Sequence, residues 1–194
     1  MALIGTKRFV RKLKKRDSNA FEVLMSQYQR PVFNLMYRML GSREEAEDLS
    51  QEVFITVFKK IDTFRGESLL STWIFRIATN ICKNRQKYLG RRYYDRPAQK
   101  AGLENIADGQ RNAGTCASVS RPDETVEGYQ TERLLQQAIG DLEEDQKLVL
   151  ILRDIENMSY DDIAAITGLP LGTVKSRLHR ARMLLKEKLV EHLR

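Results

Sequence analysis

The sequence has few of the side chains on which metal centres, disulfide frameworks and nucleophilic catalysis depend. Only two cysteines and two histidines occur in 194 residues. Cys82 and Cys116 are far apart and outside any CxxC pattern, while His179 and His192 share one basic C-terminal segment. These spacings predict neither a disulfide framework nor a metal site. Without a nucleophile–base pair or a phosphate-binding glycine loop, we also expect no catalytic activity, no cofactor and no small-molecule substrate.

Long apolar runs and strand-like alternation are missing as well. No segment approaches the length of a membrane span, and the N-terminus has no apolar signal segment. We therefore expect a cytoplasmic protein that does not insert into a membrane. Apolar residues instead recur at spacings of three and four along the chain, and there is no internal repeat, which predicts an all-α fold.

Positive charge exceeds negative charge, with 33 Lys and Arg against 26 Asp and Glu and a net charge of +7. This balance points to an acidic partner, and nucleic acid is a better candidate than lipid. Residues 1–16 hold seven basic residues and no acidic one. Phe9, Val10 and Leu13 share one side of a short helix there, which we expect to pack on its own domain rather than on a membrane.

Residues 159–185 have the pattern of two short helices that meet at a tight turn. Ser159 is the expected N-cap of the first helix, and Asp161 and Asp162 follow in its first turn, where the helix dipole favours carboxylates. Gly168 supplies the left-handed position that ends it, and Pro170 suits the start of a second helix. The segment therefore predicts a helix-turn-helix.

The second helix of this motif combines a narrow apolar stripe with a polar side. Its stripe consists of Val174, Leu178, Ala181 and Leu185. A solvated helix of an ordinary bundle would explain the charges alone, but the preceding turn favours DNA binding. The residues that we expect to contact DNA are Thr173, Lys175, Ser176, His179 and Arg180.

An acidic helix is predicted over residues 42–61, opened by a capping box of Ser42 and Glu45. Its apolar line comprises Leu49, Val53, Val57 and Ile61, whereas Asp48, Gln51 and Glu52 stand clear of that line. The acidic side is either a solvated face or a docking face for a second protein. The preceding helix, which starts at Asp17 or Ser18, is expected to be interrupted at Pro31 and to end at Gly41.

Residues 62–71 form a predicted loop around Gly66, and a helix follows over residues 72–89 with Ser71 as its expected N-cap. One side of this helix mixes an aromatic ring, amides and cations. The residues of this polar strip are Trp73, Arg76, Asn80, Lys83, Asn84 and Lys87. Such a mixture suits single-stranded nucleic acid, although a half-buried Trp on a solvated helix is the simpler alternative.

Helical periodicity disappears between residues 97 and 122, where small and polar residues dominate. A segment of this length is too long for a structureless loop inside a compact domain, so we expect a flexible linker. The sequence therefore predicts two small helical domains, residues 1–95 and 124–194, joined by a linker over residues 96–123.

Several segments, in order and at matching spacings, resemble bacterial extracytoplasmic-function sigma factors of the sigma-70 superfamily. They are RDSNAF, EEAEDLSQEVFITVFKKIDTFRGES, STWIFRIATNICKN and LEEDQKLVLILRDIENMSYDDIAAITGLPLGTVKSRLHRAR. The resemblance covers about residues 17–90 and 130–190. It implies a two-domain initiation factor that binds RNA polymerase core, reads the −35 element of a promoter with the helix-turn-helix, and opens the −10 element with the N-terminal domain.

The same resemblance assigns roles to the residues singled out above. Asp48, Gln51 and Glu52 would dock on the clamp of the largest catalytic subunit of the polymerase core. Contacts to −10 DNA would come from the loop and the polar strip, namely Phe64, Arg65, Ser68, Trp73, Arg76, Asn80, Lys83, Asn84 and Lys87. An anti-sigma factor is a further expected partner, and a stress or envelope response the expected setting. The alternative is a stand-alone helix-turn-helix regulator with an N-terminal sensing or dimerisation domain.

Overall fold

The structure, a computed structural model, describes residues 5–94 and 126–192. All of its regular elements within these ranges are helical, so the all-α prediction is confirmed. The N-terminal half comprises α1 (Lys7–Lys14), α2 (Ser18–Leu40), α3 (Arg43–Lys60), the 3₁₀ turn η1 (Ile61–Thr63) and α4 (Leu70–Tyr94). The C-terminal half comprises α5 (Val126–Gly140), α6 (Glu144–Leu150), η3 (Ile151–Ile155), α7 (Tyr160–Thr167) and α8 (Leu171–His192). The predicted linker over residues 96–123, with Cys116, lies outside the described residues.

Helix α2 corrects the expectation of an interruption at Pro31. The helix is continuous from Ser18 to Leu40, with the Asp17 carboxylate capping its start and Gly41 ending it at φ 76°. Proline removes one backbone donor from a helix interior, which normally kinks or breaks it. Here Leu24 and Val32, on either side of Pro31, are both fully buried in one core, and this shared burial keeps the two parts of the helix aligned.

The core of the N-terminal half lies between α2, α3 and α4. Its fully buried side chains include Leu24, Leu35, Met36, Val53, Val57, Ile74 and Ala78. Each such side chain contributes about 1.5–3 kcal/mol when it leaves water. The predicted apolar line of α3 is confirmed, since Leu49 and Ile61 are also buried.

The start of α3 differs in one respect from the predicted capping box. The Ser42 hydroxyl accepts a hydrogen bond from the Glu45 backbone N–H at 3.3 Å, as expected. The Glu45 carboxylate, however, does not return to the cap. It accepts two 2.6 Å hydrogen bonds from the Arg85 guanidinium on α4, and these hydrogen bonds lower its pKa. A bidentate ion pair to the neighbouring helix is stronger than a neutral bond to a cap N–H, so the side chain joins α3 to α4.

Helix α4 begins two residues earlier than predicted, at Leu70. The expectation that Ser71 caps this helix is wrong, because Ser71 lies inside it and its side chain hydrogen-bonds to Tyr28 on α2. A hydroxyl with a tertiary partner is not available to the helix end. The observed start places all six residues of the predicted polar strip on one regular helix, and we call them the α4 strip from here on.

The helix-turn-helix is present as predicted. The Ser159 hydroxyl accepts a hydrogen bond from the Asp162 N–H at 3.1 Å and caps α7. Gly168 has φ 73° at the end of α7, a left-handed conformation that glycine adopts without strain. The Thr167 hydroxyl donates to the Ile163 carbonyl at 2.7 Å, and α8 starts at Leu171.

The segment before the motif contains a π-helical turn. Helix α6 continues into η3, where the Glu156 N–H bonds to the Ile151 carbonyl, five residues earlier, at 3.0 Å. Leu148, Ile151 and Leu152 are nevertheless buried. The wider turn therefore keeps the apolar side of the segment in the core. It also leads the chain directly to Ser159, the N-cap of α7.

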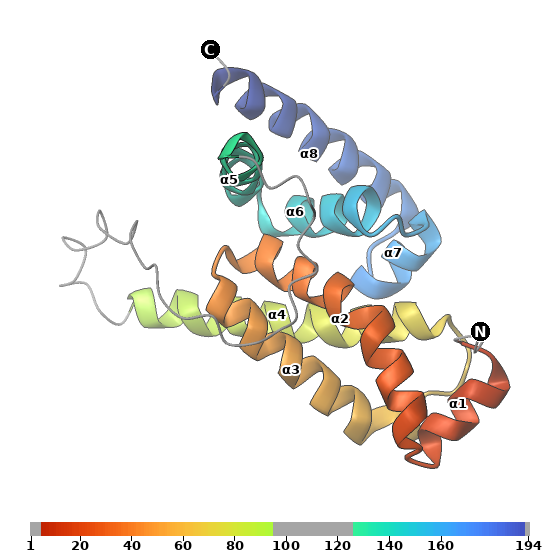
Figure 1. Cartoon of the computed structure of the whole chain (residues 1–194). Coiled ribbons are helices and arrows are strands. Elements are labelled where there is room, and N and C mark those ends of the chain that lie inside the picture. The colour runs from red at the N-terminus through yellow and green to blue at the C-terminus, as the bar shows by residue number, and fades with distance from the viewer. Residues whose placement is uncertain (1–4, 95–125, 193–194) are drawn as a thin grey trace.

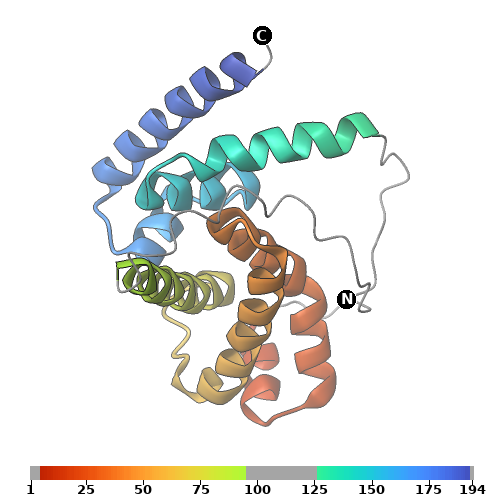
Figure 2. The ribbon, with the colours of Figure 1, turned by 90° about the vertical axis from the view of Figure 1, so that its left-hand side faces the viewer.

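The two halves pack against each other. Both views show α5–α8 on one side of α2 and α4 (Figures 1 and 2). Between α2 and α5, the Arg38 guanidinium pairs with the Glu132 carboxylate at 2.6 Å and donates to the Gln136 side chain at 3.0 Å. The Gln136 amide donates in turn to the Tyr37 carbonyl at 3.2 Å. These contacts hold the two halves in one closed arrangement.

Candidate nucleic-acid interface

The α4 strip lies beside an aromatic pair. Phe64 and Trp73 have ring centroids 5.4 Å apart and a tilt of 53° between ring planes. Phe64 is only 5% exposed, so its ring supports the partly exposed Trp73 rather than offering a face of its own. Tilted aromatic pairs of this kind are favourable beyond the area that they bury. The indole is therefore fixed at the start of the strip.

Residues 64–69, which we call the Gly66 loop, connect this pair to α4. Gly66 has φ 78°, which makes it the pivot of the loop. Arg65 and Ser68 are exposed on it, and Leu69 is 63% exposed. A loop with a cation, a hydroxyl and an apolar side chain beside an indole has the groups required to hold an unstacked base and its phosphate.

Most of the α4 strip is open to solvent. Its exposed members are Arg76, Asn80, Asn84 and Lys87, and Lys83 is partly exposed. The amides can hydrogen-bond to base edges, while the cations can pair with phosphates. The polar side predicted for this helix is therefore present along its length. Its opposite side, through Ile74, Ala78 and Cys82, is buried.

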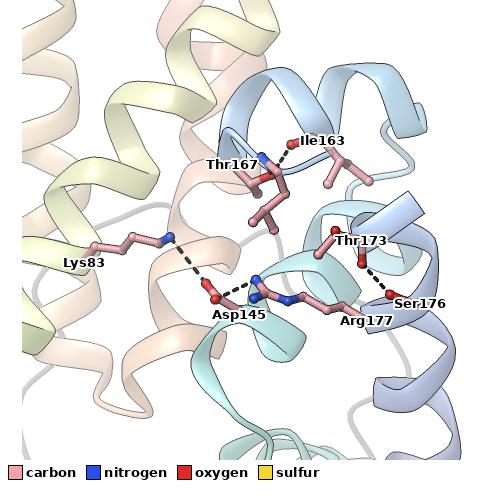
Figure 3. A network of polar contacts seen from close by, with 8 residues as sticks. Lys83, Asp145, Ile163, Thr167, Thr173, Ser176 and Arg177 are labelled. Atoms are coloured by element: carbon pink, nitrogen blue, oxygen red, sulfur yellow. Dashed lines mark hydrogen bonds and ion pairs between the residues drawn. The ribbon is translucent and has the colours of Figure 1, made fainter. Parts of the chain in front are cut away.

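The C-terminal half covers one edge of the α4 strip. The Arg76 guanidinium donates two hydrogen bonds to the Ala165 carbonyl on α7, at 3.1 and 2.7 Å. Farther along α4, the Lys83 ammonium lies 3.5 Å from Asp145, a residue of α6 that also pairs with Arg177 of α8 at 2.6 Å (Figure 3). The closed arrangement thus occupies two of the cations that the sequence assigns to DNA.

The second helix of the motif, α8, presents its predicted polar side to solvent. Lys175, Ser176, His179 and Arg180 are exposed and Thr173 is partly exposed. Val174, Leu178 and Ala181 are buried on the opposite side. An exposed polar face on a helix whose other face is packed is the geometry with which a recognition helix enters a major groove.

Contacts with η3 and α7 fix the position of α8. The Arg182 guanidinium makes a bidentate pair with the Asp154 carboxylate of η3, at 2.9 and 2.5 Å. The Lys175 ammonium lies 5.8 Å from the centroid of the Tyr160 ring on α7. The two helices of the motif therefore present their polar side chains as one unit.

The acidic side of α3 is exposed at Asp48, Gln51 and Glu52. Sequence reasoning missed Ile55, which is 53% exposed on the same side of α3. Its spacing of three residues from Glu52 and four from Gln51 was the available signal. This side of α3 therefore offers an exposed aliphatic side chain beside its carboxylates, which gives a protein partner an apolar contact as well as charge.

A shallow pocket connects the acidic side of α3 to the α4 strip. It is lined by Leu49, Glu52, Ile81, Asn84, Arg85 and Tyr88. Glu52 belongs to the acidic side, Asn84 belongs to the strip, and Arg85 is held by Glu45. The two predicted sites are therefore neighbours on one rigid pair of helices.

Cysteine, histidine and carboxylate side chains do not form a metal-binding cluster in the described ranges. Residues 5–94 and 126–192 contain no group of three or more His, Cys, Asp or Glu side chains that could hold a metal ion. Burial raises the pKa of the Cys82 thiol to about 12, which keeps it in the unreactive protonated form. Over the same ranges, no helix has the length and apolar character needed to cross a membrane.

Two family models match the chain on either side of the predicted linker. Residues 24–92 match sigma-70 region 2, and residues 132–185 match sigma-70 region 4. The ECF RNA polymerase sigma-E factor of Haemophilus influenzae is 37% identical over 180 residues, which cover 93% of each chain. The ECF RNA polymerase sigma factor SigW of Bacillus subtilis is 34% identical over 183 residues, 94% of this chain and 96% of that one.

Solved structures with the same fold agree with these matches. The sigma factor RpoE of Bartonella quintana, solved in complex with the anti-sigma factor NepR, is similar with a TM-score of 0.65 and 27% identity, over 87% of this chain and 96% of that chain. CnrH, solved in complex with the cytosolic domain of CnrY, shares the fold with a TM-score of 0.69 at 17% identity, over 94% of this chain and 96% of that one. The chain belongs to the extracytoplasmic-function sigma factors of the sigma-70 family.

Proposed function

We propose that this sigma factor directs RNA polymerase core to promoters by binding the −35 element with α8 and the −10 element with the Gly66 loop and the α4 strip. The observation that carries the proposal is the placement of an acidic docking face on α3 directly beside the nucleic-acid strip on α4. A stand-alone regulator with a sensing or dimerisation domain has no need for this pair of surfaces. A polymerase subunit that opens DNA needs both.

Asp48, Gln51 and Glu52 are the proposed contacts to the clamp of the largest polymerase subunit, and Ile55 extends this surface. Carboxylates at a protein interface guide association with a basic partner and exclude acidic ones. Because Glu52 and Asn84 line the same pocket, docking of the core at α3 would fix the orientation of the α4 strip relative to the polymerase.

The −10 contacts fall into three kinds. The proposed phosphate contacts are Arg65, Arg76, Lys83 and Lys87. The proposed base contacts are Ser68, Trp73, Asn80 and Asn84. Phe64 supports the Trp73 ring. On the −35 element, Thr173, Lys175, Ser176, His179 and Arg180 are the proposed contacts in the major groove. The Arg76 and Lys83 contacts require the C-terminal half to leave α4, since both side chains are engaged with it.

The distance between the two promoter elements supports this separation. Elements centred about 25 base pairs apart lie about 85 Å apart at 3.4 Å per base pair. In the closed arrangement α7 lies directly on α4, so the two surfaces cannot occupy such elements together. We assign residues 1–95 to the −10 and core-binding domain, 96–123 to a flexible linker and 124–194 to the −35 domain. The covalent chain between α4 and α5 is long enough to span about 100 Å when extended.

An anti-sigma factor is the proposed regulator, in a stress or envelope response. The support is the 27% identical RpoE, whose structure was solved with the anti-sigma factor NepR. We further propose that the protein acts in the cytoplasm, where polymerase core and promoter DNA meet, and that it has no catalytic activity of its own, because the roles proposed above require binding alone.

Run-off transcription with purified polymerase core on a promoter library tests the proposal. We expect initiation that depends on both the core and this chain, from promoters that share a −35 and a −10 sequence. The double substitution of Asp48→Lys and Glu52→Lys should weaken competition for core, while a control pair of exposed acids in the C-terminal half, Glu143→Lys and Glu187→Lys, should compete as the parent does. Sequence-specific duplex binding without any core-dependent initiation would instead favour the stand-alone regulator.

A further inference from the structure

The apolar side chains of helix α1 pack against the rest of the protein. Phe9 is 5% exposed and Leu13 is fully buried, and the Thr6 hydroxyl caps the helix by accepting a hydrogen bond from the Phe9 N–H at 3.3 Å. A helix that lies on a membrane needs a free apolar face to enter the lipid. The apolar face of α1 is already packed, so only its polar side is available to a partner.

The turn after α1 is attached to the segment that leads into the Gly66 loop. The Arg16 guanidinium pairs with the Asp62 carboxylate of η1 at 2.6 Å, and the Lys14 ammonium donates to the Asp62 carbonyl at 3.3 Å. Arg16 also donates to the Phe58 carbonyl and lies over the Phe58 ring, 4.7 Å from its centroid. Asp62 precedes Phe64 by two residues, so α1 and the Gly66 loop keep a fixed relation.

Arg16 has an unusual backbone conformation at this attachment. Its φ of 60° lies in the left-handed region, which non-glycine residues seldom adopt and which the surrounding contacts must hold. Figure 1 shows α1 at the end of the molecule where α4 begins. A strand that follows the α4 strip from Lys87 to Trp73 and passes the Gly66 loop would next reach α1.

The polar side of α1 carries positive charge that the protein itself does not neutralise. The exposed cations of this segment are Lys7, Arg8, Arg11, Lys12 and Lys15. In the part of the chain that the structure describes, none of them has an ion-pair partner. Residues 5–16 include no acidic side chain. Cations at spacings of four residues on one helix repel one another and destabilise it. A surface of this composition gains most from a row of phosphates.

We propose that α1 is a further nucleic-acid contact, which holds the sugar-phosphate backbone of promoter DNA next to the base engaged by the Gly66 loop. The inference rests on the proposed −10 role of that loop and extends it to a surface outside the sequence-predicted site. The contact is electrostatic and reads no base, because Lys and Arg side chains on an exposed helix reach phosphates without recognising sequence. Its effect is on the stability of the opened complex and not on promoter choice.

The test compares two matched variants of the full chain in polymerase holoenzyme. The first carries Arg8→Gln, Arg11→Gln and Lys15→Gln on α1. The control carries Arg30→Gln, Arg133→Gln and Lys186→Gln, which are exposed and unpaired cations on α2, α5 and α8 within the described ranges. Equilibrium formation of open complexes is measured over a series of salt concentrations. Circular dichroism and competition for core establish that both variants fold and bind the polymerase.

Each phosphate contact contributes about 0.7–0.9 to the slope of log K against log salt concentration. We therefore expect the α1 variant to lower this slope by about 2 and the open-complex constant at about 50 mM salt by about tenfold or more. The control should keep the parental slope, and both variants should keep the parental −10 preference. An unchanged slope for the α1 variant, with parental initiation intact, would overturn the inference alone.

Two further outcomes distinguish a failure of the α1 contact from a failure of the proposed promoter function. If the parent holoenzyme forms no open complex on any promoter of the library, the proposed function fails and the inference fails with it. Binding of the parent chain to vesicles containing phosphatidylserine, lost in the α1 variant while the open-complex slope stays parental, would assign α1 to a lipid surface and overturn the contact to DNA.

Discussion

The Thr72 hydroxyl on α4 donates a 2.7 Å hydrogen bond to the Asp162 carboxylate on α7. Thr72 is 1% exposed and Asp162 is partly exposed, so this partly buried bond joins the start of the α4 strip to the first turn of the helix-turn-helix. It stands next to the Arg76 contact with the Ala165 carbonyl. The proposed −10 and −35 surfaces are therefore joined by direct contacts in the closed chain.

Removing the Thr72 hydroxyl should loosen the closed arrangement. Thr72→Val keeps the shape of the side chain but leaves the Asp162 carboxylate without this donor, which should lower the free energy of unfolding by about 1–2 kcal/mol. Thr79→Val on the same helix is the matched control, because the buried Thr79 hydroxyl has no hydrogen-bond partner in the described structure and its loss should be neutral or stabilising. Urea unfolding of the three proteins measures the difference. Equal destabilisation by both substitutions would contradict the role assigned to the Thr72 bond.

The ion pair between Arg38 and Glu132 offers a second way to separate the halves. The Arg38 side chain is 13% exposed and that of Glu132 48%, so reversal to Glu at Arg38 leaves a mostly buried charge facing a like charge. We expect Arg38→Glu to increase the radius of gyration in X-ray scattering, and the added Glu132→Arg to restore it in part. A coupling of about 1 kcal/mol or more in a double-mutant cycle of unfolding free energies would support the pair. Strict additivity would show that it contributes nothing to closure.

Glu156 should make the stability of the closed chain depend on pH. Burial raises the pKa of its carboxyl from 4.5 to about 7, although a hydrogen bond from the Asn34 side chain on α2 acts in the opposite direction. The folded chain thus holds this proton more tightly than the unfolded chain does. The stabilising contribution is complete below about pH 4.5 and is lost as the pH rises through 7.

Glu156→Gln keeps the neutral form at every pH and should remove this dependence. Near pH 8 the variant should be more stable than the parent by about 1–2 kcal/mol, a value reduced to allow for the partial exposure of the carboxyl. Near pH 4.5 the two proteins should differ little. Urea unfolding across this interval provides the comparison, and a constant difference at all pH values would contradict the assignment.

Substitutions in the α4 strip should affect strand opening more than initial promoter binding. Trp73→Ala removes the ring on which an unstacked base would lie, and Asn80→Ala removes an amide about two turns farther along α4. Base–aromatic stacking is worth about 1–3 kcal/mol per base. We expect closed complexes to form normally, permanganate-reactive thymines to decrease, and a pre-melted bubble template to restore transcription. Equal loss on duplex and bubble templates would place the defect in folding or core binding.

Exposed residues of α8 should divide into those that read bases and those that contact only phosphates. Arg180→Ala should cost about 1–3 kcal/mol and relax the preference at one position if the guanidinium contacts a guanine. Alanine at a residue that contacts only phosphate should weaken all sequences alike and reduce the salt slope by about 1. Binding-site selection with each variant measures both effects. A preferred sequence unchanged by any substitution at Lys175, Ser176, His179 or Arg180 would remove α8 from promoter recognition.

Elements with local signals were predictable from the sequence. Ser159 and Gly168 act on backbone groups within one turn of themselves, so their roles follow from neighbouring residues alone. The buried line from Leu49 to Ile61 likewise depends only on helical spacing. The exposed polar faces of α4 and α8 were predicted for the same reason.

Features that depend on distant partners were not predictable. Glu45 pairs with Arg85 forty residues later instead of returning to the Ser42 cap, and Ser71 contacts Tyr28 instead of capping α4. The packing of α7 on α4 joins residues about ninety positions apart. Hydrophobic periodicity gives the buried side of each helix but not the partner that covers it, so the closed arrangement appears only in the structure.

The two hydrogen bonds from Arg76 to the Ala165 carbonyl place a constraint on how this lineage can diverge. In its proposed −10 role, the Arg76 guanidinium could not bind a protein carbonyl and a DNA phosphate at the same time, so a change at this position would alter the closed chain and the promoter complex together. A replacement that weakens DNA affinity also weakens the competing contact, and the two losses offset each other in the net equilibrium. A substitution at Arg76 should therefore change promoter strength less than its lost DNA contact alone would. Substitutions at Asn84 and Lys87 should have their full effect on promoter strength, because the C-terminal half leaves both side chains exposed.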